Sequence, residues 1–409
     1  MTRDTVIVTA GSFATSNVFG GHYRSASAIA QLLSDQYDVL LVNVGTKPSP
    51  VMKMPGQDTI FVHGCTGMPG PIRSRLKALM REHKVKAVVA FDQKVGEMFR
   101  PIARQLGTGF VLVKPGGGQP RLYYPKASHQ VVFMQADKVW IDQNANSKRG
   151  VTVSQAAGRI FPPMQDLEAQ NKLRQQISLH DEEIAIVRIG RIDEQYAAVS
   201  RAALALSDKL RRAGLPARTV LIGTPESAEE ITTLNAIKSK EDAIITDDLF
   251  TNQASRLLSM FRYNVGTGRG FMEGCNIGQI MMCASKKSEH RLPLLVTDEN
   301  FDLFFDQNFS PRIQPDCTPS QNEARIVELM SNQDRQQALI SRSKKWFDTS
   351  FSAENSLQVY SAMIEGAACA PETLNVDHLY SEVHMRLSVV MDRIRIALYR
   401  HVAPSTKEW

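Results

Sequence analysis

The stretch of this sequence best suited to chemistry is NVGTGRGFMEGCN, residues 264–276. Its alternating glycines, Gly266, Gly268 and Gly270, allow the backbone to turn tightly and to approach a ligand closely. We expect a short strand before them, at 261–265, and a helix from about Phe271. Free N–H groups and the positive end of the helix dipole would then face the glycine loop, and this geometry binds phosphate without any side chain.

Two side chains of this stretch would extend the anion site. Glu273 is expected in the first helical turn, where its carboxylate can accept hydrogen bonds from a sugar hydroxyl, and Arg269 adds a fixed positive charge. A diphosphate attached to a ribose would use all of these groups together. The alternative is a tight strand-to-helix turn with a glutamate placed favourably near the helix N-terminus, because short glycine patterns also occur without a ligand.

The composition is that of a soluble globular protein. The 409 residues suffice for two or three domains, and 43% of them are hydrophobic and 22% charged. The net charge of +6 suits an anionic ligand or an anionic membrane surface but does not argue for nucleic acid. Five scattered cysteines without metal-type spacing indicate reduced thiols, and no signal peptide or membrane-spanning run is evident, so we expect a cytoplasmic protein.

The first half of the chain alternates strand-like and helix-like segments. Strands are expected at 5–10, 38–44, 60–63, 86–91, 109–113 and 130–134, with helices at 25–33, 72–83 and 96–106. This alternation predicts a parallel sheet covered on both faces, and ligands of such sheets bind beyond the carboxyl ends of the strands. A second glycine loop, with Gly20 and Gly21, follows the first strand. His63, Asp92 and Lys114 end later strands, although for any single one of them an ordinary polar loop residue is the more frequent explanation.

The second half repeats the alternation after a polar, irregular stretch at 142–159 and a proline-containing hinge at 160–164. Strands are expected at 184–187, 219–222, 243–245, 261–265 and 293–296, with a helix at 196–213. The chain from about Glu323 reads as largely helical. A basic amphipathic helix at 386–401 either packs on the body of the protein or touches an anionic membrane surface.

Three short motifs together resemble the GT-B glycosyltransferases, and the nearest group is glycosyltransferase family 4. They are Gly20-Gly-His-Tyr-Arg24, Gly190-Arg191 and Gly266-Thr-Gly-Arg-Gly-Phe-Met-Glu273. The resemblance implies two Rossmann-like α/β domains that face a cleft, followed by a helical C-terminal tail. It also implies a retaining enzyme that transfers a sugar from a nucleoside-diphosphate-sugar.

The resemblance assigns roles to some residues and leaves others open. It places Gly20 and Gly21 near the donor phosphates and the acceptor, and it makes Arg191 a diphosphate ligand. Where the family carries a lysine five residues later, this chain has Tyr196, so Arg269 or Lys114 would have to replace that charge. The two family glutamates fall on Val265 and Glu273 in one register, and on Arg269 and Ile277 in the other.

The sequence therefore predicts a cytoplasmic glycosyltransferase with domains at 1–160 and 161–345 and a helical segment at 346–409. Its partners would be a nucleotide-sugar donor and a glycan or lipid-linked acceptor, as in polysaccharide biosynthesis, with peripheral membrane contact and no nucleic acid. No metal or other cofactor is expected. The donor site would comprise the residues Gly20, Gly21, Lys114, Arg191, Gly268, Arg269, Gly270 and Glu273.

Asp92 and His22 are the residues expected to position the acceptor hydroxyl and, secondarily, to take its proton. Two other classes of protein remain open from the sequence. A sugar-nucleotide epimerase of similar architecture would need paired acid and base groups around the sugar. A two-lobed binding protein would bind the ligand without any reaction.

Overall fold

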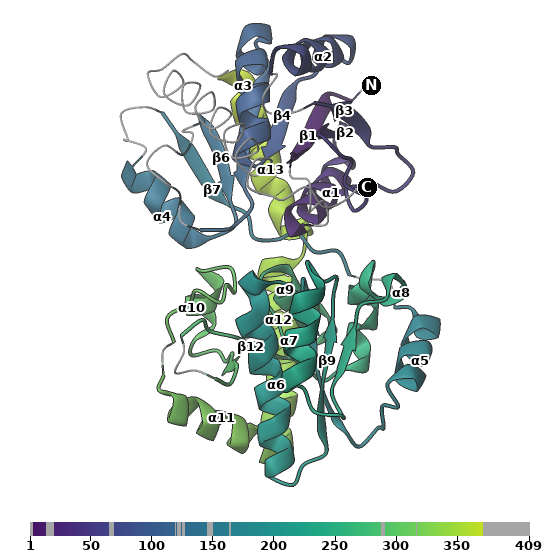
Figure 1. Cartoon of the computed structure of the whole chain (residues 1–409). Coiled ribbons are helices and arrows are strands. Elements are labelled where there is room, and N and C mark those ends of the chain that lie inside the picture. Colours follow the sequence, from purple (N-terminus) through teal and green to yellow (C-terminus); the bar gives the residue numbers. More distant parts are fainter. Residues whose placement is uncertain are drawn as a thin grey trace, which may run out of the picture. The chain divides into compact units, whose positions relative to one another are not determined.

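A computed structural model describes residues 3–13, 20–64, 69–118, 120, 124, 127–144, 150–162, 165–287, 291–315 and 317–370. The chain forms two compact units, which are coloured along the sequence in Figure 1. The first unit combines Met1–Arg159 with Ala353–Trp409, and the second comprises Ile160–Ser352. The last helix described therefore groups with the N-terminal sheet, whereas the predicted limits of 1–160, 161–345 and 346–409 stay a prediction.

The first unit is built on a seven-stranded sheet in the order β3-β2-β1-β4-β5-β6-β7, in which all neighbouring strands are parallel. Its strands are β1 Thr5–Ser12, β2 Asp38–Gly45, β3 Ile60–His63, β4 Ala87–Phe91, β5 Gly109–Lys114, β6 His129–Val132 and β7 Thr152–Gln155. The helices are α1 Gly21–Leu33, α2 Pro69–Glu82, α3 Gln93–Leu106, α4 Gln135–Asn144 and α13 Glu354–Cys369. Strands such as β4 are buried along their whole length, as apolar runs covered by helices must be.

The second unit is built on a six-stranded sheet in the order β10-β9-β8-β11-β12-β13, with only β13 antiparallel to its neighbour. Its strands are β8 Ile184–Ile189, β9 Ala217–Ile222, β10 Ala243–Ile245, β11 Tyr263–Val265, β12 Ile280–Cys283 and β13 Leu294–Leu295. The α-helices are α5 Leu167–Gln176, α6 Ala197–Arg212, α7 Ala228–Ile237, α8 Asp248–Thr251, α9 Arg269–Ile277, α10 Phe301–Phe305, α11 Pro319–Ser331 and α12 Gln333–Trp346. Shorter helical turns are η2 Glu194–Tyr196, η3 Ala254–Met260 and the π-helix η4 Phe347–Phe351.

Each sheet has hydrophobic cores of its own. Ile7, Val88 and Phe99 belong to a buried cluster of the first unit, and Ile186, Val265 and Leu206 to one of the second. Helix α13 completes the first unit, because Glu365 pairs with Lys86 at 2.8 Å and the Ser356 hydroxyl donates to the Gly158 carbonyl. In Figure 1 this helix lies against the strands of the N-terminal sheet.

Most predicted elements are confirmed, and the structure differs from the prediction at several others. The stretch 142–159 is not irregular throughout, because it contains the end of α4 and the edge strand β7. Strand β12 was missed. The strand expected at 293–296 is only two residues long and antiparallel. Helix α9 begins at Arg269 rather than at Phe271.

Two predictions fall on residues outside the described ranges. The hinge at 160–164 includes Pro163 and Met164, and the amphipathic helix at 386–401 lies wholly within the undescribed part of the chain. Among the helices that the structure describes, none has both the length and the apolar character needed to span a bilayer.

The carboxyl ends of β8 and β9 lie in unusually close contact. A Cβ atom on Gly223 would lie 1.8 Å from the carbonyl oxygen of Gly190, so only glycine fits at position 223. Beyond the ends of β8 and β9 the two backbone segments stay paired, because Ile192 N–H donates to the Thr224 carbonyl and Glu226 N–H donates to the Ile192 carbonyl. The glycine therefore fixes the direction in which the chain leaves β8.

Gly223→Ala should lower the free energy of unfolding by about 2 kcal/mol or more, because overpacking against backbone cannot relax as a flexible side chain can. Thermal melting measures this change. Gly70→Ala is the matched control, since a Cβ there meets no atom within 4 Å and alanine favours the helix. Equal melting temperatures for Gly223→Ala and the parent protein would contradict the close approach.

Candidate functional site

The glycine loop before α9 is folded tightly onto the first turn of the helix. Gly268 caps the helix with a φ of 49°, and a Cβ on Gly266 would lie 2.7 Å from the Cα of Phe271. The Phe271 ring is fully buried and stacks on Phe309 at a centroid distance of 3.7 Å. The buried Phe271 and Phe309 rings thus hold the loop in place, and the positive end of the α9 dipole faces the loop.

Glu273 occupies a different place from the one predicted. Because α9 begins at Arg269, Glu273 falls in the second turn, and no acidic residue lies in the first turn. Its carboxylate accepts a hydrogen bond from Arg269 Nε at 2.7 Å, and both side chains are largely buried. The two predicted donor residues are therefore together, but here each offsets the charge of the other.

Arg191 lies just beyond the end of β8. Its guanidinium pairs with Asp193 Oδ2 at 3.1 Å and lies 5.2 Å from the centre of the Tyr196 ring. Asp193 also accepts the Tyr196 N–H at 2.8 Å, so the acid both caps η2 and orients the arginine. Asn264 pairs with Val187 in the sheet, and the Gly270 Cβ position lies 3.5 Å from the Ile189 carbonyl oxygen. The ends of β8 and the glycine loop are therefore adjacent.

The sequence analysis missed a second arginine at this place. Arg188 is the only charged residue of β8 and is 4% exposed. Its guanidinium lies 5.7 Å from the centre of the same Tyr196 ring. A charged residue inside an otherwise apolar strand is the signal that could have identified it, because such a charge needs a partner or a function.

In the first unit, Asp92 occupies a strained turn between β4 and α3. Its φ of 96° is rare for any residue except glycine, and such strain concentrates at functional sites. One carboxylate oxygen accepts the Val95 N–H and the other the Gly11 N–H, both at 3.0 Å. Burial raises the pKa of Asp92 to about 6, although these backbone hydrogen bonds act in the opposite direction.

His22 lies in the first turn of α1, near the same place. Its ring contacts the Tyr23 ring at a centroid distance of 3.8 Å, and a Cβ on Gly20 would lie 2.9 Å from the imidazole. The Tyr23 hydroxyl donates to the Gly11 carbonyl at 3.0 Å, so Tyr23 connects the helix to the residue that donates to Asp92. Burial and the Asp92 charge raise the pKa of Tyr23 to about 12. Sequence reasoning overlooked Tyr23.

Lys114 and His63 are placed differently from these residues. The buried ammonium of Lys114 donates to the carbonyls of Gly116 and Gly118 at 2.9 Å and pairs with Asp137 at 2.9 Å. Lys114 therefore holds its own glycine loop, and its role toward the donor stays a prediction. His63 ends β3 with its side chain exposed. Gly21 is exposed at the start of α1, and a Cβ there would meet no atom within 4 Å.

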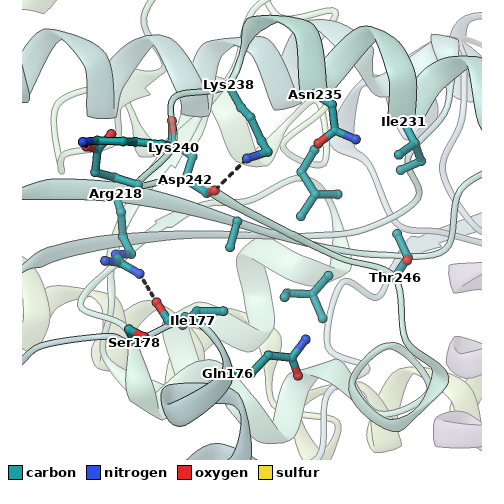
Figure 2. Close-up of a pocket in the computed structure, with 14 residues that line it drawn as sticks. Gln176, Ile177, Ser178, Arg218, Ile231, Asn235, Lys238, Lys240, Asp242 and Thr246 are labelled. Carbon is teal, nitrogen blue, oxygen red and sulfur yellow. Dashed lines mark hydrogen bonds and ion pairs between the residues drawn. The ribbon is translucent and has the colours of Figure 1, made fainter.

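A cavity of about 620 Å³ lies along the free edge of β10, and no residue of the glycine loop before α9 lines it. Figure 2 shows Arg218 directed at the Ile177 carbonyl and Lys238 at the backbone carbonyl of Asp242. Its basic residues are thus engaged by the protein itself. Across the described ranges, no three His, Cys, Asp or Glu side chains gather as a metal site.

Comparison with known proteins identifies relatives by structure alone, because no protein-family model and no curated protein sequence matches this chain. A glycosyltransferase from Rickettsia africae ESF-5 superposes with a TM-score of 0.63 at 11% identity, covering 89% of this chain and 98% of the other. Anabaena HepE in complex with UDP and glucose gives 0.61 at 12% identity, with 89% and 100% covered. A putative UDP-N-acetylglucosamine 2-epimerase from Listeria monocytogenes gives 0.56 at 8% identity, with 89% and 96% covered.

These likenesses extend over both units and establish the fold. The chain consists of two parallel-sheet α/β domains of the GT-B type, as the sequence predicted. At these identities the activity does not follow from the comparison. It must be argued from the two clusters of residues around Arg191 and Asp92.

The raised pKa of Asp92 predicts a pH-dependent contribution to stability. The folded state binds this proton more tightly than the unfolded state, so the contribution is complete below the unfolded pKa near 4 and is lost as pH rises through about 6. Relative to Asp92→Asn, the parent protein should gain roughly 1–3 kcal/mol between pH 7.5 and pH 4.5. Urea unfolding at both pH values measures this gain. The control is Asp35→Asn, at an exposed position: relative to this variant, the parent protein should show no such gain in stability. An equal pH response of the two variants would contradict the raised pKa of Asp92.

Proposed function

We propose that this protein is a glycosyltransferase that moves a sugar from a nucleoside-diphosphate-sugar to an acceptor hydroxyl, with retention of configuration. The proposal rests on one observation. At the carboxyl end of the second sheet, arginine side chains lie next to the N-terminus of α9 and the glycine loop that precedes it. Arg191 lies there beside the turn that contacts Gly270, the position at which open α/β sheets bind nucleotides.

The chemistry of donor cleavage matches these groups. Breaking the bond between the sugar and the diphosphate places negative charge on the leaving oxygen and positive charge on the sugar ring. Arginine and helix N–H groups are already oriented, so they stabilise the leaving group without reorganising. Such a site does not require a metal to stabilise the leaving group. The ion pair of Arg269 and Glu273 lies on the same helix, α9, and would contact the sugar nucleotide. Since HepE was captured with UDP and glucose, UDP-sugars are the first donors to test.

The first unit would position the acceptor. With a pKa of about 6, Asp92 is mostly ionised at neutral pH and can accept a hydrogen bond from an acceptor hydroxyl. His22 lies nearby and offers a second polar group. In a retaining front-face reaction the departing phosphate itself takes the hydroxyl proton, so these residues act mainly by orientation. A glycan or lipid-linked glycan is the acceptor class we propose.

An epimerase is the second candidate, because the Listeria protein shares the fold and because a carboxyl group with a pKa of about 6 can exchange protons near neutral pH. An epimerase inverts one carbon of the sugar while the nucleotide stays attached. Incubation of the parent protein with UDP-sugars, with and without acceptor, separates the two activities. Transfer gives UDP and an extended acceptor, whereas epimerisation gives an isomeric UDP-sugar without any acceptor.

For the variants, transfer and slow donor hydrolysis should respond differently. Asp92→Asn and His22→Ala should reduce transfer roughly 10- to 100-fold, the loss expected for one hydrogen bond to a charged group, while donor hydrolysis and UDP binding persist. Chromatography of UDP release with and without acceptor measures both rates. Lys47→Ala, at an exposed position of the same unit, is the control. Transfer at the parent rate in both site variants would place the acceptor elsewhere.

A further inference from the structure

Arg188 is a buried positive charge that forms no ion pair with any carboxylate in the described part of the chain. It projects from β8, is 4% exposed, and donates through one terminal nitrogen to the backbone carbonyl of Ile189. Its Nε has no hydrogen-bond partner among the described residues, and within the same ranges no carboxylate lies within ion-pair distance of the guanidinium. Asp193, the neighbouring acid, is already engaged by Arg191 and the Tyr196 N–H.

A second buried arginine of the same unit, Arg218, also has an Nε without a hydrogen-bond partner among the described residues, but a carboxylate lies beside its guanidinium. Arg218 is 8% exposed, and it pairs with Glu183 at 2.8 Å and donates to the Ile177 carbonyl. Burying a charge without a partner is costly, whereas a buried pair recovers most of that cost. Burial lowers the pKa of Arg188 to about 10, so its guanidinium still carries a positive charge at neutral pH. Among the described residues, Arg188 therefore differs from Arg218 in having no carboxylate at ion-pair distance.

The surroundings of Arg188 indicate where that counter-charge binds. A Cβ on Gly190 would lie 2.5 Å from the guanidinium, so the group lies directly against the Gly190 turn. The same turn leads to Arg191 and contacts the glycine loop through Ile189 and Gly270. Both arginines lie near the Tyr196 ring, at 5.7 and 5.2 Å, and a ring face attracts and orients guanidinium groups. Two guanidinium groups therefore share one aromatic support beside the positive end of α9.

We propose that Arg188 supplies a second fixed positive charge to the diphosphate site, acting with Arg191 on the leaving group. This proposal rests on the proposed function and identifies the diphosphate, rather than the base or the sugar, as the part of the donor that Arg188 recognises. A charge held in the low-dielectric interior acts strongly on an anion nearby. The proposed role of Arg188 also explains the aromatic residue at position 196. The Tyr196 ring orients two arginines, whereas a lysine there would contribute a single charge.

The test compares the binding of UDP, uridine and inorganic pyrophosphate by calorimetry, with GDP, ADP and dTDP in parallel to cover the other bases. Arg188→Gln should weaken binding of the preferred nucleoside diphosphate and of pyrophosphate roughly 10- to 100-fold, the range typical of a charge-assisted hydrogen bond. Binding of the corresponding nucleoside should change less than twofold. Arg188→Lys, which keeps the charge, should retain most of the preference for the diphosphate.

Arg218→Gln is the matched control, because it removes a buried arginine of the same unit far from the glycine loop. It should lower the melting temperature but leave the ratio of diphosphate to nucleoside affinity unchanged. An unchanged ratio in Arg188→Gln would overturn the role of Arg188 while leaving the proposed function intact. If Arg188→Gln does not fold, Tyr196→Leu decides, since loss of the shared ring should reduce the ratio at least threefold and an unchanged ratio would overturn the proposal.

Two further outcomes separate this proposal from the proposed function. Binding of pyrophosphate that depends on Arg188, without binding of any nucleoside diphosphate, would support the anion site and overturn the nucleotide-sugar function. Failure of the parent protein to bind pyrophosphate and all four nucleoside diphosphates would overturn both.

Discussion

The close approach of the backbone at Gly190 and Gly223 is the constraint on which the proposed donor site depends. The Gly190 carbonyl occupies the space where any side chain at 223 would begin, so β8 and β9 remain paired past their ends. The chain leaving β8 then turns sharply over the Arg188 guanidinium and places Arg191 beyond it. Neither arginine could lie beside Tyr196 and the α9 loop if this turn were wider. Backbone packing thus sets the electrostatics of the site.

Much of the fold was predictable because parallel sheets leave strong marks in a sequence. Apolar runs such as Val88–Phe91 are buried on both faces, and the glycine loops after β1 and β11 mark the change from strand to helix. The rule that ligands lie beyond the carboxyl ends of parallel strands led to Asp92 without any structure, whereas Arg191 came from the resemblance to the GT-B glycosyltransferases. Asp92 lies in a strained turn and Arg191 in a charged one, and each turn directly follows a strand of a parallel sheet.

The remaining features depend on contacts that sequence spacing does not determine. Glu273 pairs with Arg269 because α9 starts two residues earlier than its apolar pattern suggests, with Gly268 at a positive φ of 49° as its cap. Lys114, at the end of β5, forms an ion pair with Asp137 of α4, so a basic residue at a strand end need not be available to a ligand. Arg188 carries a local signal, a charge inside an apolar strand, but only the structure shows that no carboxylate of the described residues forms an ion pair with it.

The central claim is that a nucleoside-diphosphate-sugar binds at the carboxyl end of the second sheet. Amide hydrogen exchange with and without saturating UDP-glucose, repeated with other nucleotide-sugars, tests this claim directly because it reports the location of binding. The account predicts slower exchange at 188–196 and 266–272, with the β10 edge at 240–246 unchanged. Protection confined to the β10 edge, or binding without protection at 188–196 and 266–272, would contradict it.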